Sequence, residues 1–228
     1  MGKIPVQVER KAAFPEKTRC VILAAGKISD YDALRPLVAG GAFVICADGG
    51  YRHAAAFGIV PQLFIGDGDS CPPGEITADE VIRLPREKDD TDTLFCAREG
   101  VRRGYCDFLI LGATRGPRLD HLFANFCVLD FLLTQGAFGR MADEYSEIQM
   151  IENTRRRFSR QEGVMLSVFP FGGAASGVTL RGVKYPLTDA TLTSDFPIGV
   201  SNAFVPSAEY AEIEVKSGKL LIFMTQAD

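Results

Sequence analysis

The sequence is poor in the residues that build the commonest metal and redox sites. It contains two histidines and no tryptophan, and none of its six cysteines belongs to a C-x-x-C pair. This argues against a structural zinc site, which takes four Cys or His ligands. Several cysteines sit inside apolar runs, where a free thiol packs as a small hydrophobe. We therefore expect buried, reduced cysteines and no disulfide framework.

Long apolar runs and an excess of positive charge are also missing. No apolar run approaches the roughly 18 residues that a membrane helix needs, and residues 1–19 contain no secretion-type apolar segment. The net charge of −4 argues against a protein whose main task is to coat nucleic acid or an anionic membrane. We expect a cytoplasmic protein with no nucleic-acid or membrane partner and a flexible N-terminal tail over residues 1–19.

Several catalytic motifs are absent. The chain has no G-x-x-x-x-G-K-[ST] phosphate loop, no protein-kinase motif set, no G-x-S-x-G turn and no H-E-x-x-H pair. A standard P-loop nucleotide hydrolase, a serine hydrolase of that type and a zinc protease are therefore not supported.

The first half of the chain alternates between strand and helix patterns. A long helix is predicted over Arg118–Gln135, where apolar residues recur every three or four positions, and another begins near Asp90 or Thr91. Short apolar runs, each followed by a Gly- or Asp-rich break, predict the strands Cys20–Ala25, Phe43–Ala47, Leu63–Ile65 and Phe108–Leu111. This alternation predicts an N-terminal α/β domain with a parallel sheet over residues 20–142.

The second half of the chain has a different secondary-structure pattern. Turns are predicted at Phe171–Gly173 and Ser217–Gly218. Between such turns, short β-prone segments lie at Ile148–Ile151, Val164–Phe169, Val178–Leu180, Ala190–Thr193, Ala211–Val215 and Leu220–Met224. We expect a second domain over residues 143–228, built as an antiparallel β-sandwich.

Glycines and carboxylates follow the predicted strands of the first half. Three such breaks stand at Asp48–Gly50, Gly66–Ser70 and Gly112–Gly116. The carboxyl ends of parallel strands form the ligand crevice of an open α/β sheet, and glycine turns let backbone N–H groups approach an anion closely. This pattern favours a phosphate-containing ligand, although each turn taken singly also suits a simple change of chain direction.

Acidic residues are concentrated in one segment. Between Asp67 and Asp92 the chain carries nine Asp or Glu residues, including the pairs Asp67-x-Asp69 and Asp90-x-Asp92. Carboxylate oxygens are the protein ligands that Mg²⁺ prefers. The other interpretation is a solvated acidic loop with a helix cap.

The start of the long helix adds a third polar cluster. Arg118, Asp120 and His121 stand where free N–H groups and the helix dipole attract anions, and a guanidinium suits a phosphate oxygen. Asp120 would also stabilise the first turn of any helix, and a lone His on an apolar helix is more often a packing residue.

Taken in order, these motifs resemble the thiamine pyrophosphokinase (thiamine diphosphokinase) family over roughly residues 20–224. The motifs are Asp48-Gly49-Gly50, Gly66-Asp67-Gly68-Asp69-Ser70, Lys88-Asp89-Asp90-Thr91-Asp92, Gly112-Ala113-Thr114 with Arg118-Leu119-Asp120-His121, and Ser201-Asn202. The resemblance implies transfer of a diphosphoryl group from ATP to the hydroxyl of thiamine, giving thiamine diphosphate and AMP, with Mg²⁺ as cofactor and ATP as co-substrate. It also implies a homodimer.

The resemblance assigns roles residue by residue. It implies that the catalytic set is Asp48, Asp67, Asp69, Asp92, Arg118 and Asp120, of which Asp67, Asp69 and Asp92 bind the metal. The nucleotide-contacting set is Gly49, Lys88, Thr91, Thr114, Arg115, Gly116 and His121. The thiamine-contacting residues that it implies are Ser201 and Asn202. Because the chain has no Trp, a Tyr or Phe must stack on the ring of the vitamin, and we select Tyr185 as the candidate; the other interpretation of Tyr185 is a core residue of the sandwich.

The sequence departs from the family pattern at two places, and these departures leave two alternative functions open. The segment Thr114–Arg118 has one residue more than the family's G-A-T-G-G-R-x-D-H pattern and carries Arg115 in place of a glycine, and Ala203 replaces an acidic residue. The alternatives are a metal-dependent nucleotide phosphohydrolase that uses water as acceptor, and a non-catalytic sensor of a nucleotide or thiamine diphosphate.

Overall fold

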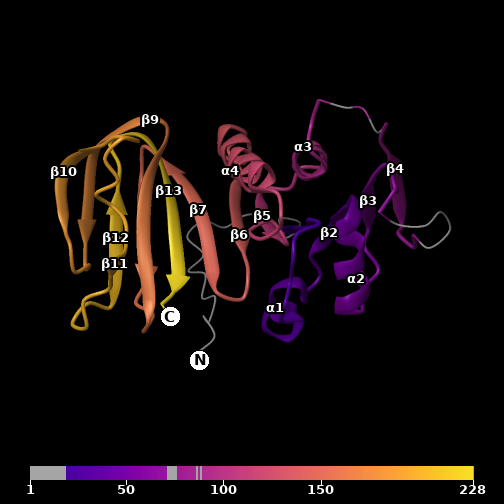
Figure 1. Ribbon diagram of the computed structural model, residues 1–228, viewed down its shortest axis with the longest axis horizontal. Helices are drawn as coiled ribbons and strands as arrows, with labels where there is room; N and C mark the ends of the chain where they lie inside the picture. The colour runs from indigo at the N-terminus through magenta and orange to yellow at the C-terminus, as the bar shows by residue number, and fades with distance from the viewer. Residues whose placement is uncertain (1–18, 71–75, 86, 88, 228) are drawn as a thin grey trace. The chain divides into compact units, whose positions relative to one another are not determined.

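The computed structural model describes residues 19–70, 76–85, 87 and 89–227. The described residues up to Glu144 form one compact unit and those from Tyr145 onward form another. The predicted tail before residue 19, Cys71 and the predicted nucleotide-contacting Lys88 lie outside the described residues. The strands and helices of both units are labelled in Figure 1.

The first unit contains a parallel sheet, which confirms the α/β prediction. Its strands are β1 (Arg19–Leu23), β2 (Phe43–Ala47), β3 (Leu63–Gly66), β4 (Glu80–Arg83), β5 (Asp107–Leu111) and β6 (Phe138–Ala142). Their order is β4-β3-β2-β1-β5-β6, and every neighbouring pair is parallel. Apart from the half-buried first residues of β1, β2 and β5, the central strands are apolar and buried, as the short continuous apolar runs predict.

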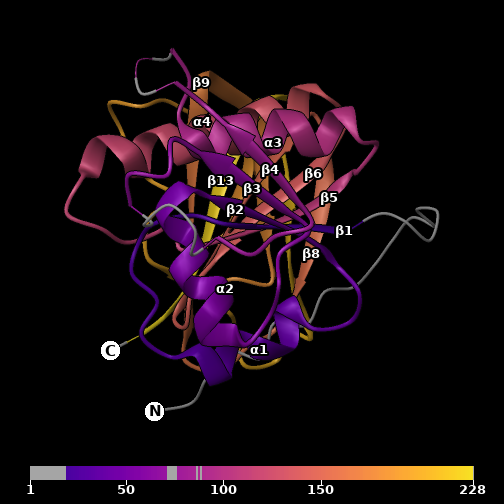
Figure 2. The ribbon, with the colours of Figure 1, turned by 90° about the vertical axis from the view of Figure 1, so that its right-hand side faces the viewer.

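Four α-helices cover this sheet. They are α1 (Tyr31–Val38), α2 (Tyr51–Phe57), α3 (Asp92–Arg102) and α4 (Leu119–Thr134). Figure 2 shows α3 and α4 on one face of the sheet and α1 and α2 on the other. Thr91 caps α3 by accepting the N–H of Leu94 at 3.2 Å, as predicted for that position. The sequence patterns missed α1 and α2, because each spans only about two turns.

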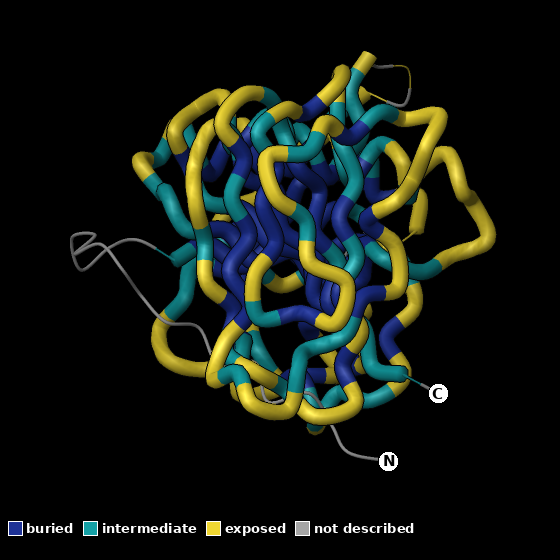
Figure 3. Tube along the Cα trace, turned by 90° about the vertical axis from the view of Figure 1, so that its left-hand side faces the viewer, coloured by how far each residue is buried: buried dark blue, intermediate teal, exposed yellow. Residues whose placement is uncertain are grey.

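The second unit is built of antiparallel strands. They are β7 (Ser146–Glu152), β8 (Arg155–Ser159), β9 (Val164–Arg181), β10 (Leu187–Leu192), β11 (Asn202–Ala203), β12 (Tyr210–Glu214) and β13 (Ser217–Gln226). The first part of β9 pairs with β13, and its last part pairs with β10 and β12. Apolar residues of β9, β12 and β13 form its core, and Figure 3 shows the buried segments in the middle and the exposed turns around them.

The two turns predicted in this half are wrong. Residues 171–173 lie inside β9 and residues 217–218 lie inside β13. Gly172 has φ of +73°, and the pairing with β13 jumps from Phe171 to Ser176, so the glycines produce a bulge that leaves the strand continuous. The glycines do interrupt the regular pairing, but the residues on both sides of them pair with β13, so the strand continues.

The cysteine prediction holds for part of the described set. Cys20, Cys46 and Cys96 are free and buried, whereas Cys106 is half-buried and Cys127 is exposed. The expectation of burial is wrong for Cys127, because it lies on the outward face of α4. Among the described helices, none is both long and apolar enough to cross a membrane.

Candidate active site

The chain order of the parallel sheet creates a crevice beside β1. The chain adds β2, β3 and β4 on one side of β1 and then returns to add β5 and β6 on the other. The loops after β1 and β5 therefore leave the sheet in opposite directions, and ligands of open α/β sheets bind at such a point. The crevice found there has a volume of about 630 Å³.

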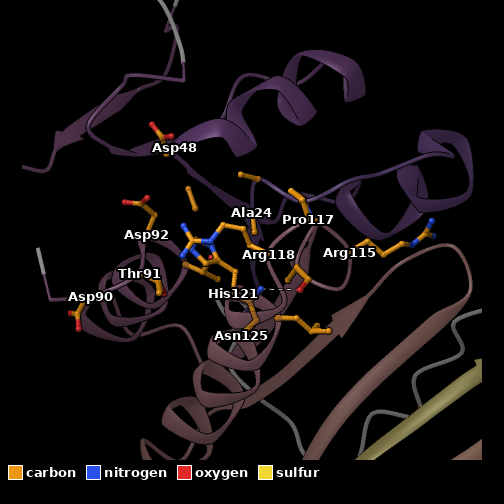
Figure 4. A pocket seen from close by; sticks show the side chains of 18 of the residues that line it. Ala24, Asp48, Asp90, Thr91, Asp92, Arg115, Pro117, Arg118, His121 and Asn125 are labelled. Carbon is orange, nitrogen blue, oxygen red and sulfur yellow. Dashed lines mark hydrogen bonds between the residues drawn. The ribbon is translucent and has the colours of Figure 1, made fainter. Parts of the chain in front are cut away.

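Loops after three strands and the first turns of two helices line this crevice. They are residues 24–26 after β1, Asp48 after β2, residues 112, 113 and 115–117 after β5, the start of α3 and the start of α4. Figure 4 shows the side chains of Asp48, Asp92, Arg118 and His121 around this space. The structure thus brings together Asp48, Thr91, Asp92, Arg115, Gly116, Arg118 and His121 of the predicted site.

Asp48 occupies a turn that orders the neighbouring acidic loop. Its φ of +41° lies in the left-handed region, which non-glycine residues adopt at a cost. Its carboxylate accepts the N–H of Gly68 at 3.2 Å and the hydroxyl of Ser70 at 2.6 Å. A Cβ at residue 66 would lie 2.7 Å from the Asp48 Cβ, so glycine is required there. The loops after β2 and β3 are therefore held against each other.

This contact places three carboxylates together. Single oxygens of Asp48, Asp67 and Asp69 all lie within 4.8 Å of one another. Asp67 also accepts the N–H of Asp69 at 3.0 Å, which fixes the turn between them. The predicted metal set of Asp67, Asp69 and Asp92 differs in one member, because the third carboxylate of the group is Asp48. Asp92 lines the crevice from α3 instead.

The first turn of α3 presents polar groups to the crevice. Thr91 is its N-cap and Asp92 its first residue, and both line the crevice with Asp90. Asp90 forms an ion pair with Arg98 of the same helix. Because the free N–H groups of a helix start attract anions, this end of an 11-residue helix suits a phosphate group.

The first turn of α4 carries an exposed ion pair. The Nε of Arg118 donates to Asp120 Oδ1 at 3.1 Å, and the Nη2 bonds the other carboxylate oxygen. This hydrogen bond holds the pKa of Asp120 down to about 2 and raises the pKa of Arg118. Both side chains are therefore charged at neutral pH. Asp120 is paired with Arg118 outside the lining of the crevice, whereas Arg118 and His121 belong to that lining.

The loop after β5 directs two side chains to the segment that follows β6. The hydroxyl of Thr114 donates to Asp143 at 2.7 Å. The Arg115 guanidinium bonds Glu144, and Figure 4 shows it extending away from the other labelled side chains. Both side chains are thus engaged with the segment after β6, and the predicted contact of this loop with phosphates, which is made by backbone N–H groups near Thr114–Gly116, stays a prediction. The loop lines the crevice at Arg115, Gly116 and Pro117.

The sequence patterns gave little weight to the loop after β1, which lines the same crevice. Gly26 donates its N–H to the carbonyl of Gly112 at 2.7 Å, and a Cβ on Gly26 would overlap the carbonyl oxygens of Gly112 and Arg115. Behind this loop, His53 donates its Nε2–H to the Gly26 carbonyl at 2.7 Å and accepts the hydroxyl of Tyr31 at 2.8 Å. Burial lowers the pKa of His53, so the ring is neutral. The signal in the sequence is Gly26 directly after a buried strand.

Gly49 completes the set predicted in the first unit. It is buried behind the crevice, where a Cβ would lie 3.2 Å from the Cβ of Ala25. A side chain at this position would press on the loop after β1, so its role in the structure is close packing.

The three residues predicted to contact thiamine lie together in the second unit. The side chain of Asn202 accepts the N–H of Tyr185 at 2.9 Å and donates to the carbonyl of Tyr185 at 2.7 Å. The Tyr185 ring is exposed, with the Lys184 ammonium 5.2 Å from its centroid. Ser201 has φ of +55°, and its N–H donates to the Ser167 hydroxyl at 3.0 Å. Asn202 thus fixes the backbone that presents Tyr185.

The fold and the crevice define an α/β protein with a site suited to phosphate groups and a divalent cation. Comparison with known families makes this specific. The model of the thiamin pyrophosphokinase catalytic domain matches residues 34–137, and that of the thiamin pyrophosphokinase vitamin B1 binding domain matches residues 151–220. The chain belongs to the thiamin pyrophosphokinase family.

Individual relatives agree with this assignment. The thiamine pyrophosphokinase of Bacillus subtilis (strain 168) is 28% identical over 161 residues, which are 66% of this chain and 72% of that protein. A solved thiamin pyrophosphokinase family protein from Enterococcus faecalis is 27% identical, with a TM-score of 0.79 over 92% of this chain and all of that one. The yeast enzyme, at 14% identity, shares the fold with a TM-score of 0.75 over 93% of this chain and 87% of its own.

Proposed function

We propose that this chain transfers a diphosphoryl group from ATP to the hydroxyl of thiamine, and that ATP binds in the crevice beside β1. The observation that carries the assignment of the site is the convergence of carboxylates and two helix starts at the carboxyl ends of β1, β2 and β5, next to the Asp67 and Asp69 carboxylates after β3, inside a chain that matches both domains of the family. The matches do not support the hydrolase or the sensor.

The chemistry needs alignment and charge neutralisation more than covalent help. The starts of α3 and α4 supply N–H groups for phosphate oxygens, and Arg118 supplies a guanidinium beside them. Among the carboxylates that line the crevice, we assign Asp92 as the group that accepts the proton of the thiamine hydroxyl. Asp120 stays ionised and holds Arg118 in its first-turn position.

A divalent cation fits the group of Asp48, Asp67 and Asp69. The donor set is three carboxylates, the hard oxygen ligands that Mg²⁺ takes in combination with substrate phosphates. When bound, Mg²⁺ neutralises phosphate charge and orients the chain of phosphates. Asp48 orders the loop that carries the other two carboxylates, so it supports the set through its hydrogen bonds to Gly68 and Ser70.

On the thiamine side, we assign the contact with the ring of the vitamin to Tyr185. Its side chain is exposed while its backbone is held at two atoms by Asn202, so the backbone that carries the ring is fixed before a ligand arrives. Ser201 lies in the same turn and offers a hydroxyl. Asn202 supports Tyr185 through these two bonds, and its direct contact with thiamine stays a prediction.

We also propose a homodimer that works in the cytoplasm. The outward face of α4 exposes Leu119, which is 77% exposed, and Phe123, which is 62% exposed, with Cys127 one turn further on. Apolar side chains in such a row are typical of a surface covered by a second copy. Sedimentation of the protein should give a dimer, and the double variant L119S/F123S should give a monomer. A monomeric wild type would contradict the proposal.

The direct test of the activity uses purified protein with ATP, Mg²⁺ and thiamine. We expect AMP and thiamine diphosphate to form in equal amounts, as measured by chromatography. Neither product should form when thiamine or the metal is left out. Release of phosphate or pyrophosphate in the absence of thiamine would instead identify a hydrolase. Tight binding of thiamine diphosphate without turnover would identify a sensor.

A further inference from the structure

Arg115 lies where the sequence departs from the family pattern, and its side chain joins two buried carboxylates. Its Nη2 bonds Glu144, and its Nε donates to Asp143 Oδ2 at 3.4 Å. The side chains of Asp143 and Glu144 are only 6% and 4% exposed, whereas that of Arg115 is 32% exposed. Two buried carboxylates next to each other are costly unless a cation neutralises them, and Arg115 provides that charge.

The same carboxylates hold other segments of the first unit. Glu144 accepts the N–H groups of Ser29 and Asp30, the latter at 2.7 Å, directly before α1. Asp143 accepts the hydroxyl of Thr114 at 2.7 Å. The end of β6 therefore links the loop after β5 to the segment that leads into α1.

The backbone of Arg115 completes this link on the crevice side. Its carbonyl accepts the N–H of Lys27 at 3.0 Å, next to the bond between Gly26 and Gly112. The loop after β5 is thus fixed to the loop after β1 by its backbone and to the end of β6 by its side chains. Both loops line the crevice.

We propose that Arg115 is a positioning residue for the ATP site. It holds the loop of residues 112–117 in the shape that forms one wall of the crevice. Its guanidinium acts through Glu144 and Asp143 and does not itself bind the nucleotide. The inference rests on the proposed binding of ATP in this crevice. It explains how the chain tolerates an additional residue and an arginine in this loop: the guanidinium is directed to carboxylates behind the loop.

The test compares Arg115→Gln, Glu144→Gln and the double variant with wild type in steady-state kinetics. Loss of the ion pair loosens the wall, so each single variant should raise the KM for ATP by about tenfold, because small misplacements of binding groups are costly. The KM for thiamine should stay within about twofold. Because the two side chains act as one unit, the double variant should be no worse than the poorer single variant. Arg115→Lys, which keeps the charge, should recover part of the loss.

Arg102→Gln is the matched control. Arg102 also pairs with a buried carboxylate, Glu99, at 2.6 Å, but it lies at the far end of α3 and outside the crevice. Its KM for ATP should equal that of wild type. An unchanged KM for ATP in Arg115→Gln overturns the proposal. A large effect of Arg115→Gln together with a silent Glu144→Gln also overturns it, because that result means direct contact with the nucleotide.

Failure of the proposed function would look different. In that case wild type forms no thiamine diphosphate. The affinity of the same variants for ATP, measured by calorimetry, then tests whether Arg115 positions the loop. If Arg115→Gln does not fold, as judged by its thermal transition, the isosteric Glu144→Gln carries the test. Glu144→Gln keeps an oxygen for the N–H groups of Ser29 and Asp30, so a folded variant with a wild-type affinity for ATP would refute the link.

Discussion

The two units of this chain use polar side chains in different ways. In the first, charged and hydroxyl groups collect where parallel strands end, and Asp48, Asp92 and Arg118 face a common crevice. In the second, Asn202 of the Ser201-Asn202 motif bonds the backbone of Tyr185 with its side-chain amide. One region presents its polar groups directly, and the other uses them to present a ring.

Strand geometry explains this difference. Parallel strands all end at one edge of the sheet and are followed by helices, so their loops gather N–H groups and side chains that the sheet itself does not use. Antiparallel strands are joined by turns that bond back onto the ladder, and their polar groups find partners there. A phosphate and metal site therefore belongs at the parallel edge, and a site for an aromatic ring needs only a rigid turn.

The largest expected effect lies in the carboxylate group of the first unit. Asp67→Asn should lower turnover by at least roughly a hundredfold, because it removes charge where phosphoryl charge is neutralised. The control is Asp32→Asn on α1, whose carboxylate is 87% exposed and pairs with Arg35 at 3.4 Å. The comparison is measured as kcat by AMP formation. Near-normal turnover of a folded Asp67→Asn protein would remove this residue from the site.

A second prediction concerns the close approach of two crevice loops. Gly26→Ala places a Cβ on the carbonyl oxygens of Gly112 and Arg115, so the backbone must move, whereas Gly116 has nothing within 4 Å of its Cβ position. We expect Gly26→Ala to lower the free energy of unfolding by roughly 1–3 kcal/mol and to weaken ATP binding. Gly116→Ala should leave the free energy of unfolding close to that of wild type. Urea unfolding measures the stability of both variants, and calorimetry measures the affinity of Gly26→Ala for ATP. Equal stability of the two variants would show that the two loops can move apart at little cost.

The third prediction tests the second unit by itself. Tyr185→Ala should raise the KM for thiamine by about tenfold, the scale of a lost aromatic contact, and leave the KM for ATP unchanged. Tyr185→Phe should keep the affinity, because the ring carries the contact. Tyr210, an exposed tyrosine of β12, provides the control variant Tyr210→Ala. An increase in the KM for ATP in Tyr185→Ala would contradict the assignment of thiamine contact to the second unit and ATP contact to the first.

The smallest expected effect is a pH dependence of stability. Burial lowers the pKa of His53 below its ordinary value of 6.5, so below pH 6.5 the unfolded chain binds a proton that the folded chain excludes. The free energy of unfolding should therefore fall as the pH drops below 6.5, with a contribution of at most about 1.4 kcal/mol per pH unit from this ring. Urea titrations of wild type and His53→Gln measure it. A slope that is the same in both would show that His53 does not titrate in this range.

The sequence predicted the elements whose signals are local. Buried parallel strands are continuous apolar runs, so β2 was predicted at its observed bounds, and α4 was predicted to within one residue at each end. Strand β4 was missed because most of its side chains are exposed, and helices α1 and α2 were missed because they are short. The bulge in β9 was taken for a turn, because its pairing partner is more than 40 residues away in the chain.

The sequence by itself determined which residue types follow each strand, and with them the chemistry available for phosphate and a cation. The tertiary structure decided which of those side chains meet. Asp48 joins Asp67 and Asp69 because the left-handed turn after β2 and the missing side chain at Gly66 bring two loops into contact. Arg115 leaves the crevice because two buried carboxylates after β6 attract it. Both outcomes depend on distances across the sheet, which residue order along one strand and its loop does not encode.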